Sequence, residues 1–593
     1  MLVVRLNMRD RGKQMEKYYP TLQYVVVDLT KEAWSVHTLS PSIFSSFLGG
    51  HGLGLYLYES HCSKEEESCE QSPIVFTTGL FTQFHIIDKD SLSMTALSPI
   101  SNTVKSATNH TSFATYLISC GFCALVLTGS ARRPMVLDIE AQDVIFNPTE
   151  KLLNKRVKET ITLLNLSNKQ SAIVIGPSGE NKIPFASLIS DGKSLEREGF
   201  GALLGSKRIK AIVIDKGPYS FATRYQKEID EITKEIKNKI HNSSYYKNEE
   251  ANNHLNIVKN ANEGGFAGVA HSTKRCDPRI MHLYGSTYPS LYSHPLHLQI
   301  GTVFIADKYG NKVLMDSNTM LSFGSNIKNY DPSLSATYTQ LSIEVGLDPI
   351  STAMIISWVM EGVERGVVND IPLSYTDHSH LEEIIESIAS LSGSGKKLAK
   401  GSPFLAKEYK NGDFITCIHN KEMMPYDPRG SYGQALLMTL GYDFLHPEDT
   451  LYSISPLTEI KGKAQSAILS EQLYLLSTAL GVSYKNIVAL LYDVTFYRLL
   501  SSASVKKNSV VLTRIVNYIL GDEIPLIDIY DVARRTLALE MRLNATSRAT
   551  DETLPLQFLL DGDSNCEKES TVPFTKLLNE YKVLYEIELS SIK

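Results

Sequence analysis

Hydrophobic residues change their spacing part-way along the chain. In the first third they form short runs rich in β-branched residues, such as Tyr24–Leu29 and Ala172–Ile175, between clusters of Gly, Pro, Asn or Ser. Runs of this length between turn-forming residues are typical of buried strands. One segment, Asn154–Leu166, has apolar residues at helical spacing instead. The pattern therefore predicts a β-rich domain interrupted by one helix.

From about Phe221 the spacing becomes helical. Isoleucines recur three or four residues apart, with Lys and Glu between them, at Ile229, Ile232, Ile236 and Ile240. This arrangement gives an otherwise polar helix one apolar face. Further helices are predicted at Asp348–Glu361, Leu381–Leu391, Ala464–Leu480, Tyr484–Leu500 and Ile527–Asn544.

The length of the chain requires more than one hydrophobic core. It has 593 residues, whereas single cores stop growing at roughly 250–300 residues. With the change in spacing, this predicts an α+β protein. We expect a β-rich N-terminal domain at 1–216, a helical middle domain at 217–420 and a helical C-terminal domain at 421–593.

The net charge and the lengths of the apolar runs argue against nucleic-acid and membrane partners. The formal net charge is −6, which gives no general attraction for nucleic acid or anionic lipid. The longest apolar stretch, Leu117–Gly129, is shorter than the roughly 20 residues that cross a bilayer. Charged residues from Arg9 interrupt the N-terminal apolar run before a secretory signal forms. We expect a cytoplasmic protein with no nucleic-acid or membrane partner.

Two cysteines form a CxxC motif, Cys120 and Cys123. Such a pair is half of a tetrahedral metal site or a redox couple in some proteins. The sequence contains no second CxxC, and the pair adjoins the apolar run Ala124–Leu127. We therefore predict buried structural thiols.

Three segments carry candidate polar chemistry. Ser190–Lys207 is rich in glycine but matches no phosphate-binding fingerprint, so it is either a structural turn or a close-approach loop. In the rigid turn Pro425–Gly430, Arg429 either binds an anion or pairs with Asp427. His446, sixteen residues beyond Gly430, is either structural or an acid–base group near neutral pH.

Short segments in the same order and at the same spacing resemble the aldehyde:ferredoxin oxidoreductase family. Among them are Phe47–Gly54, Ile175–Asn181, Gly199–Ile212, Glu344–Asp348 and Asp551–Pro555. The resemblance implies an enzyme with a tungsten or molybdenum pterin that oxidises aldehydes to carboxylates and passes electrons to ferredoxin. It also implies a β-rich N-terminal domain that cradles two pterins, followed by two helical domains.

The chain departs from this family where an iron–sulfur cluster is held. The family binds a four-iron cluster through a CxxCxxxC run and one distant cysteine. The matching positions are Leu291, His294, Leu298 and, near the distant cysteine, Ser504. Leu and Ser do not replace thiolates as iron ligands. No 4Fe-4S cluster is expected.

Phosphate-binding positions are also changed. Ser91 and Ser194 stand near the places where the family has arginines, and Thr108–Thr111 replaces an Asn-Ser-Gly-Gly loop. A pterin phosphate needs cations, N–H donors and room for close backbone approach. Losing these groups together predicts weak or absent pterin binding.

Some family positions are retained. Ile343 replaces the leading aspartate of one motif, but Glu344, Gly346 and Asp348 remain. By resemblance, these three and Arg429 are the candidates for cofactor binding.

The resemblance also indicates which residues would act beside the metal. His446 matches the active-site histidine of the family. The acid beside the metal becomes Asn318, which cannot exchange a proton as a carboxylate does. Asp316, two residues earlier, is a candidate displaced acid. The catalytic candidates are therefore His446 and Asp316.

Two functions compete. The first is a catalytically degenerate family member that acts as a binding, scaffold or regulatory subunit, as a homodimer or as a heteromer with an active relative. The second is an oxidoreductase that still binds a tungsten or molybdenum pterin and reduces ferredoxin or another acceptor. A sensor that binds a small molecule in the emptied pterin cavity is a variant of the first, because fold does not settle function.

Overall fold

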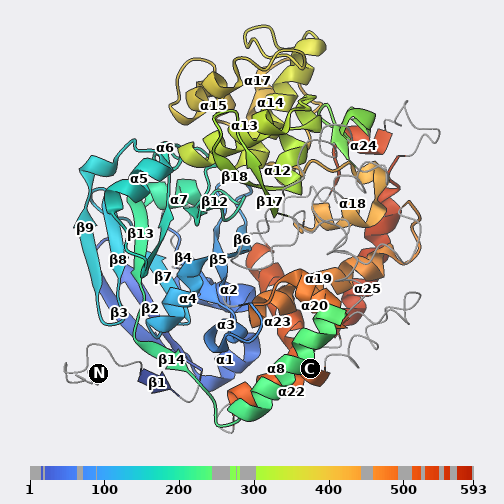
Figure 1. Ribbon diagram of the computed structural model, residues 1–593. Coiled ribbons are helices and arrows are strands. Elements are labelled where there is room, and N and C mark those ends of the chain that lie inside the picture. Colours follow the sequence, from blue (N-terminus) through green and yellow to red (C-terminus); the bar gives the residue numbers. More distant parts are fainter. Residues whose placement is uncertain are drawn as a thin grey trace.

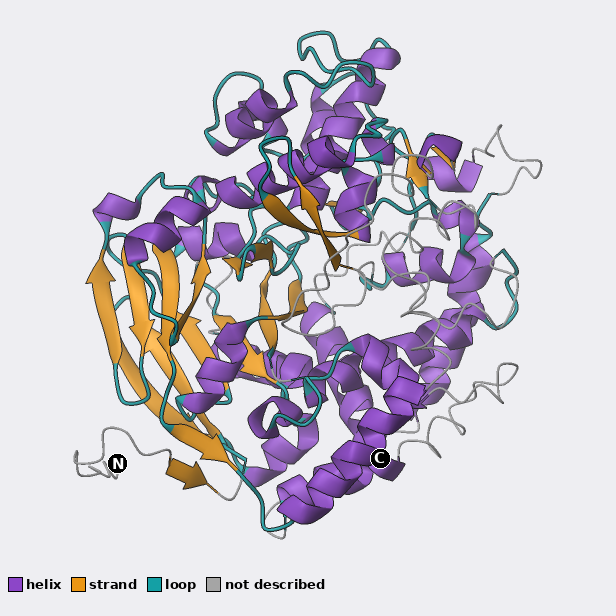
Figure 2. Cartoon of the chain, in the orientation of Figure 1, coloured by secondary structure: helices purple, strands orange, loops and turns teal. Residues whose placement is uncertain are grey.

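Two β-sheets precede a mostly helical region. The structure is a computed structural model and describes residues 15–17, 20–62, 71–88, 90–242, 267–275, 277–280, 302–442, 458–491, 510–521, 528–545, 553–560 and 571–590. Figure 1 shows the sheets on one side, with helices above them and to their right. Figure 2 shows the same division by type of element. The α+β prediction, strands first and helices later, is confirmed.

The first sheet has six strands in the order β3-β2-β7-β4-β5-β6. Strands β2 and β7 are parallel, and the other neighbours are antiparallel. Every residue of β4 is buried, as expected for a central strand covered on both faces. The bounds are β2 Gln23–Asp28, β3 Ala33–Thr38, β4 Ile74–Thr78, β5 Ser91–Leu97, β6 Val104–His110 and β7 Ala124–Thr128.

The second sheet also has six strands, in the order β12-β11-β10-β13-β8-β9. Only β13 and β8 pair in parallel. The bounds are β8 Met135–Ile139, β9 Val144–Pro148, β10 Gln170–Val174, β11 Ile189–Ser190, β12 Lys193–Ser194 and β13 Ile209–Asp215.

A shared core lies between the sheets. Val27 and Phe76 of the first sheet and Ile173 and Ile212 of the second belong to one buried cluster. The opposite face of the first sheet packs against helices drawn from both ends of the chain. The sheets therefore form a rigid support for the segments at their upper edge in Figure 1.

Helices account for most of the remainder. Those near the sheets are α1 Pro41–Phe47, α2 Gly50–His61, α3 Leu80–Phe84, α4 Ser112–Ser119, α5 Val157–Leu164, α6 Pro177–Glu180, α7 Phe200–Ser206 and α8 Gln226–Asn242. The middle of the chain holds α12 Ser317–Ser322, α13 Pro332–Val345, α14 Pro349–Glu364, α15 Leu381–Ala389, α16 Gly395–Leu398 and α17 Ser402–Glu408. The last part holds α18 Tyr432–Thr439, α19 Lys463–Leu480, α20 Tyr484–Leu491, α22 Val510–Leu520, α23 Ile529–Asn544, α24 Leu556–Leu560 and α25 Phe574–Ser590.

Short two-stranded pairs and 3₁₀ turns complete the described elements. The strand pairs are β1 Met15–Lys17 with β14 Tyr219–Phe221, β15 Gly268–Val269 with β16 Lys274–Arg275, β17 Thr302–Ala306 with β18 Lys312–Asp316, and β19 Cys417–Ile418 with β20 Lys421–Glu422. The 3₁₀ turns are η1 Glu150–Leu152, η2 Ser325–Ile327 and η3 Pro428–Gly430.

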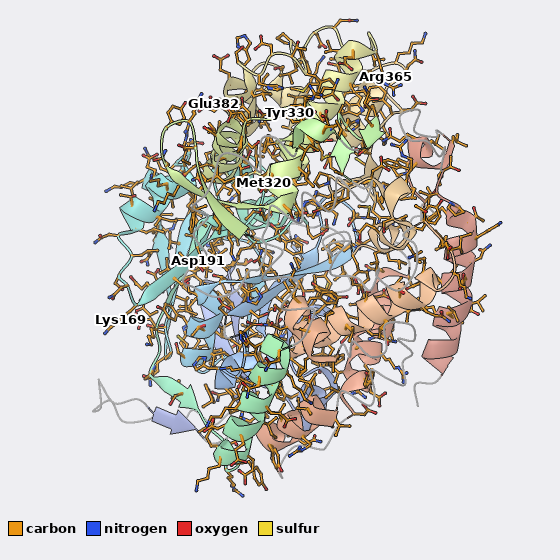
Figure 3. The ribbon with its side chains drawn as sticks, turned by 45° about the vertical axis from the view of Figure 1, so that its right-hand side comes forward. Lys169, Asp191, Met320, Tyr330, Arg365 and Glu382 are labelled. Carbon is orange, nitrogen blue, oxygen red and sulfur yellow. The ribbon has the colours of Figure 1, made fainter. Side chains whose placement is uncertain are left out.

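The predicted helices are present. All four isoleucines of α8 are buried, and α5, α14, α15, α19 and α23 lie within a few residues of their predicted bounds. The helix predicted at Tyr484–Leu500 is seen as α20, and its second half lies outside the described residues. Figure 3 shows Met320 of α12 inside the molecule, with Arg365 and Glu382 towards its upper rim.

Within the described ranges, no single helix has the length and apolar character of a membrane span. The consecutive helices α19 and α20 reach that composition together, but the chain bends by 115° between them.

Glycines allow the sheet region and the C-terminal helices to touch backbone to backbone. A Cβ built on Gly50 lies 2.1 Å from the carbonyl oxygen of Thr478 in α19, and Gly50 has φ +52°. A Cβ on Gly79 lies 2.1 Å from the backbone nitrogen of Gly481. Side chains at either position would push α19 away from the sheet region.

We predict that Gly50→Ala lowers the free energy of unfolding by about 2–5 kcal/mol, through the left-handed φ and the overpacking at Thr478. Gly192→Ala is the matched control, because Gly192 also has φ +77° but a Cβ there meets nothing within 4 Å. Urea denaturation of both variants measures the difference. Equal losses in the two variants would contradict a close contact at Gly50.

Candidate functional site

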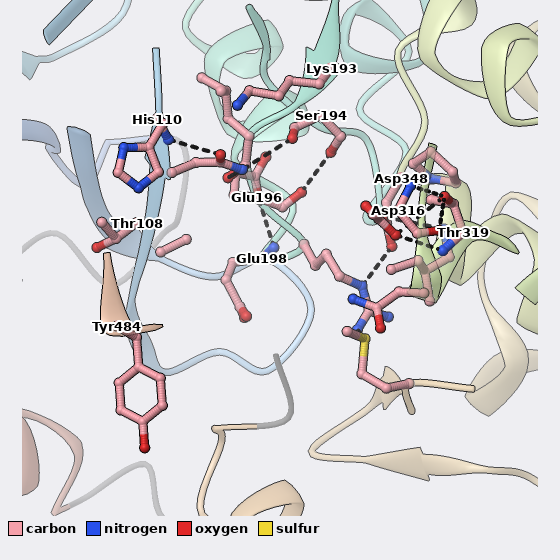
Figure 4. A pocket seen from close by; sticks show the side chains of 18 of the residues that line it. Thr108, His110, Lys193, Ser194, Glu196, Glu198, Asp316, Thr319, Asp348 and Tyr484 are labelled. Atoms are coloured by element: carbon pink, nitrogen blue, oxygen red, sulfur yellow. Dashed lines mark hydrogen bonds and ion pairs between the residues drawn. The ribbon is translucent and has the colours of Figure 1, made fainter. Parts of the chain in front are cut away.

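A cavity of about 390 Å³ lies where the sheets meet the helices; we call it the central cavity. Its walls come from β5 and β6, the segment 193–198, the β18–α12 junction, the α13–α14 junction, and α19 and α20. Figure 4 shows labelled side chains of β6, the segment 193–198 and the β18–α12 and α13–α14 junctions around the cavity, with Tyr484 at its margin. The polar lining residues are Ser91, Ser106, Thr108, Asn109, His110, Lys193, Ser194, Glu196, Arg197, Glu198, Asp316, Asn318, Thr319, Thr339, Asp348, Lys421, Tyr474, Ser477, Thr478, Ser483, Tyr484 and Lys485.

Positions at which the resemblance implies a departure from the family pattern meet at this cavity. Ser91, Thr108, Ser194, Asn318 and Ile343 all line it, although they are spread over some 250 residues of sequence. The substitutions therefore change one site rather than several unrelated surfaces.

Two of the candidate residues lie at the central cavity. Asp348 lines it and caps α14, where its side chain accepts hydrogen bonds from the backbone N–H groups of Ile350 and Ser351. Asp316 lines it and caps α12 through a capping box with Thr319. Each carboxylate therefore has a local structural role as well as its place in the wall.

Three other candidates lie elsewhere or cannot be placed. Glu344 is outside the central cavity, where its Oε2 accepts a 2.9 Å hydrogen bond from the backbone N–H of Lys158 in α5. Gly346 caps α13 in the left-handed region, and its backbone packs on Gly176. His446 lies outside the described residues, as do the cluster positions Leu291, His294, Leu298 and Ser504.

Arg429 does not line the central cavity. It is buried, and its guanidinium pairs with Asp427 at 2.5 Å and donates to the carbonyl oxygen of Ser272 at 2.7 Å. Of the two interpretations of the Pro425–Gly430 turn, the internal ion pair is the one that the structure shows.

Arg197 is a cavity residue that the sequence interpretation missed. Its Nε donates to Asp348 at 3.0 Å, and its terminal nitrogens reach the Met424 sulfur and the Glu422 carbonyl oxygen. The only signal in the sequence was an arginine inside the glycine-rich segment, three residues after Ser194. The cavity wall therefore contains a guanidinium, but that guanidinium is already hydrogen-bonded to other residues of the protein.

A second cation of the cavity is also paired. The Lys421 ammonium lies 2.7 Å from Oε1 of Glu198, and both side chains are largely buried. The other oxygen of Glu198, Oε2, has no hydrogen-bond partner among the described residues. Oε1 of Glu198 therefore pairs within the protein, and Oε2 can accept a hydrogen bond from a ligand or a water molecule.

Glu196 lies between these groups. Its side chain accepts hydrogen bonds from the backbone N–H groups of Leu188 and Glu198. Burial raises the pKa of Glu196 to about 7, against the opposing effect of those hydrogen bonds. This carboxyl therefore changes charge near neutral pH.

The formal charges of the lining balance. The cations are Lys193, Arg197, Lys421 and Lys485, and the carboxylates are Glu196, Glu198, Asp316 and Asp348. Burial lowers the pKa of Lys193 from its usual value, partly offset by Asp191, Asp90 and Asp316. With Glu196 ionised, the lining therefore carries no excess of formal positive charge.

The CxxC cysteines lie apart from the central cavity. Cys120 and Cys123 are both buried free thiols, as predicted, and burial raises the pKa of each to about 12. The Cys120 thiol donates to the carbonyl oxygen of Asp215 at 3.1 Å. Both are therefore protonated at neutral pH, whereas a cysteine nucleophile reacts as the thiolate. In the described part of the chain, no three His, Cys, Asp or Glu side chains converge as a metal site.

The protein is therefore of the α+β class, with a cavity between its β-sheet domain and its helical region. A family model described as aldehyde ferredoxin oxidoreductase, N-terminal domain, matches residues 24–216, and one described as domains 2 and 3 of the same enzyme matches residues 302–587. The chain belongs to the aldehyde ferredoxin oxidoreductase family.

Relatives and a solved structure agree with this assignment. The chain is 24% identical over 432 residues to the tungsten-containing aldehyde ferredoxin oxidoreductase of Pyrococcus furiosus, covering 70% of this chain and 71% of that protein. It is 23% identical over 420 residues to the WOR-like subunit of an aliphatic sulfonate oxidoreductase of the same organism, covering 63% and 65%. The BamBC active-site complex of benzoyl coenzyme A reductase, solved with 1,5-dienoyl-CoA, has the same fold, with a TM-score of 0.75, 18% identity and coverage of 97% and 98%.

We predict that Asp348→Ala lowers the free energy of unfolding by about 3–5 kcal/mol, because it removes a helix cap and leaves the Arg197 guanidinium in a buried site without its carboxylate. Asp331→Ala is the matched control. Asp331 also caps a helix that begins with proline, but its side chain is exposed, so a loss of about 1 kcal/mol is expected. Chemical denaturation compares them, and similar losses would contradict the role of the buried pair.

We predict that stability depends on pH through Glu196. The pKa of Glu196 is near 4.5 in the unfolded chain and about 7 in the folded chain. The folded state therefore binds the proton more tightly between these two pH values. This contribution is complete below pH 4.5 and is lost as pH rises through 7, by up to about 3 kcal/mol. Unfolding free energies of wild type and Glu196→Gln from pH 4.5 to 8 should diverge by that amount. Parallel curves would contradict the raised pKa.

Proposed function

We propose that this protein is a catalytically degenerate member of the family that binds a small molecule in its central cavity without a tungstopterin or an iron–sulfur cluster. In this role it serves as a binding or regulatory subunit, as a homodimer or beside an active relative. The observation that carries the proposal is that two of the four cavity cations pair with carboxylates of the same wall, Arg197 with Asp348 and Lys421 with Glu198.

A bound phosphate needs free cationic donors and backbone N–H groups. Arg197 would have to leave Asp348, the Met424 sulfur and the Glu422 carbonyl to supply them. Phosphate at this wall would also meet Glu196 and Glu198, the two carboxyls of the 193–198 segment. We infer that these residues do not fit a pterin phosphate.

Substitution of the metal-proximal acid supports the same proposal. Asn318 is almost fully buried, and its Oδ1 has no hydrogen-bond partner among the described residues. An amide offers a fixed acceptor and donor but does not act as an acid or a base at physiological pH. Asn318 is therefore suited to hold a ligand and not to move a proton.

The deciding experiment is metal analysis of the protein purified without oxygen from its native host, together with an aldehyde-oxidation assay. We expect tungsten, molybdenum and iron each far below one atom per chain, and no aldehyde-dependent reduction of ferredoxin or of a viologen dye. A tungsten-containing relative purified in the same way is the positive control. One tungsten or molybdenum per chain, or about four irons, the content of a cubane cluster, would instead establish the active oxidoreductase.

A further inference from the structure

We infer that the central cavity binds a small, uncharged, hydroxyl-rich molecule, a polyol or a monosaccharide. This inference rests on the proposed function, because it assumes that no pterin fills the cavity. It comes from three observations: buried acceptors without partners, a wall rich in hydroxyl groups, and a balance of charge.

Three buried polar atoms of the lining have no hydrogen-bond partner among the described residues: Glu198 Oε2, Asn318 Oδ1 and Thr339 Oγ1. Their residues are 8%, 9% and 1% exposed. An unsatisfied buried polar group costs about 1–3 kcal/mol, so native proteins rarely keep several at one place without a ligand or ordered water. Two of the three accept only, so the ligand must donate hydrogen bonds.

The same wall also offers donors and groups that do both. Ser91 and Thr339 carry hydroxyls at the cavity, and Lys193 brings an ammonium. A ligand hydroxyl donates one hydrogen bond and accepts others. Several hydroxyls on one small molecule can therefore donate to Glu198 and Asn318 while they accept from Lys193.

Charge disfavours ionic ligands. The lining holds four cations and four carboxylates, and two of its ion pairs are already formed. An anionic ligand would give up its hydration beside Glu198, and a cationic ligand would do so beside Lys193. Moving a charge out of water is costly unless an opposite charge replaces the lost hydration, and here each charge that could do so lies beside a charge of the other sign. An uncharged ligand incurs neither cost.

Size is consistent with such a ligand. The volume of about 390 Å³ lies near the lower end of the range of about 300–1,000 Å³ for small-molecule sites. The apolar part of the lining, which exceeds its polar part, can meet the C–H faces of such a ligand.

Isothermal titration calorimetry of the full-length protein tests the inference with matched probes. The uncharged probes are erythritol, xylitol, myo-inositol and glucose, and the charged probes are glucuronate, glucosamine and inorganic phosphate. We expect at least one uncharged probe to bind with a Kd below about 1 mM, equivalent to about −4 kcal/mol, and at least tenfold tighter than every charged probe. Binding of none of the uncharged probes, or tighter binding of a charged one, would overturn the inference.

Variants locate the binding in the central cavity. Asn318→Ala should weaken the affinity for the best probe at least tenfold, and Thr339→Val, which keeps the side-chain volume, should weaken it at least threefold. Asn326→Ala is the matched control, because Asn326 is also buried, at 0% exposed against 9% for Asn318, and also has an unpartnered Oδ1, but does not line this cavity. Its affinity should be unchanged, and equal losses in Asn318→Ala and Asn326→Ala would show a general structural effect instead.

Metal analysis of the same samples separates the two ideas. Metal-free protein that binds no uncharged probe would overturn the ligand class and leave the degenerate role standing. Stoichiometric tungsten or molybdenum would overturn the degenerate role, whatever the calorimetry gives.

Discussion

The central cavity depends on close backbone contact at glycines. Gly50 and Gly79 let the sheet region rest directly on the backbone of Thr478 and Gly481, and Gly176 does the same against Val345 and Gly346. Thr478 itself lines the cavity, and Gly346 lies between Ile343 and Asp348, which also line it. Because packed backbones deform little, these contacts fix the distance between opposite walls. The polar side chains can therefore change while the shape of the cavity is kept.

Within this rigid arrangement, the pairing of charged side chains determines which ligands the cavity can bind. A guanidinium that donates to Asp348, a sulfur and a carbonyl oxygen has its main directions occupied. A buried pair of this kind adds little net stability but is costly to break. Arg197 therefore stays with Asp348 unless a ligand offers a better partner, and this favours ligands that do not compete for it.

The sequence predicted the order of strands and helices, because the spacing of apolar residues follows directly from which face is buried. The isoleucines of α8 are an example. It did not predict α2, whose N-terminal half is rich in glycine, because these glycines serve close contacts with distant residues, such as Gly50 with Thr478 and Gly52 with Thr536. Contacts between residues more than 400 positions apart leave no local pattern.

The site shows the same limit. The altered positions Ser91, Ser194 and Asn318 were found by resemblance, but only the folded chain shows that they share one cavity. Counting lost arginines was not enough, because Arg197 lies in the wall three residues from the position where a cation was expected. Whether a charged residue of the cavity can bind a ligand depends on whether it is already paired, and the pairing is set by tertiary structure. For this chain the pairing of Arg197 with Asp348, and not the absence of arginine, is the physical reason to expect an uncharged ligand.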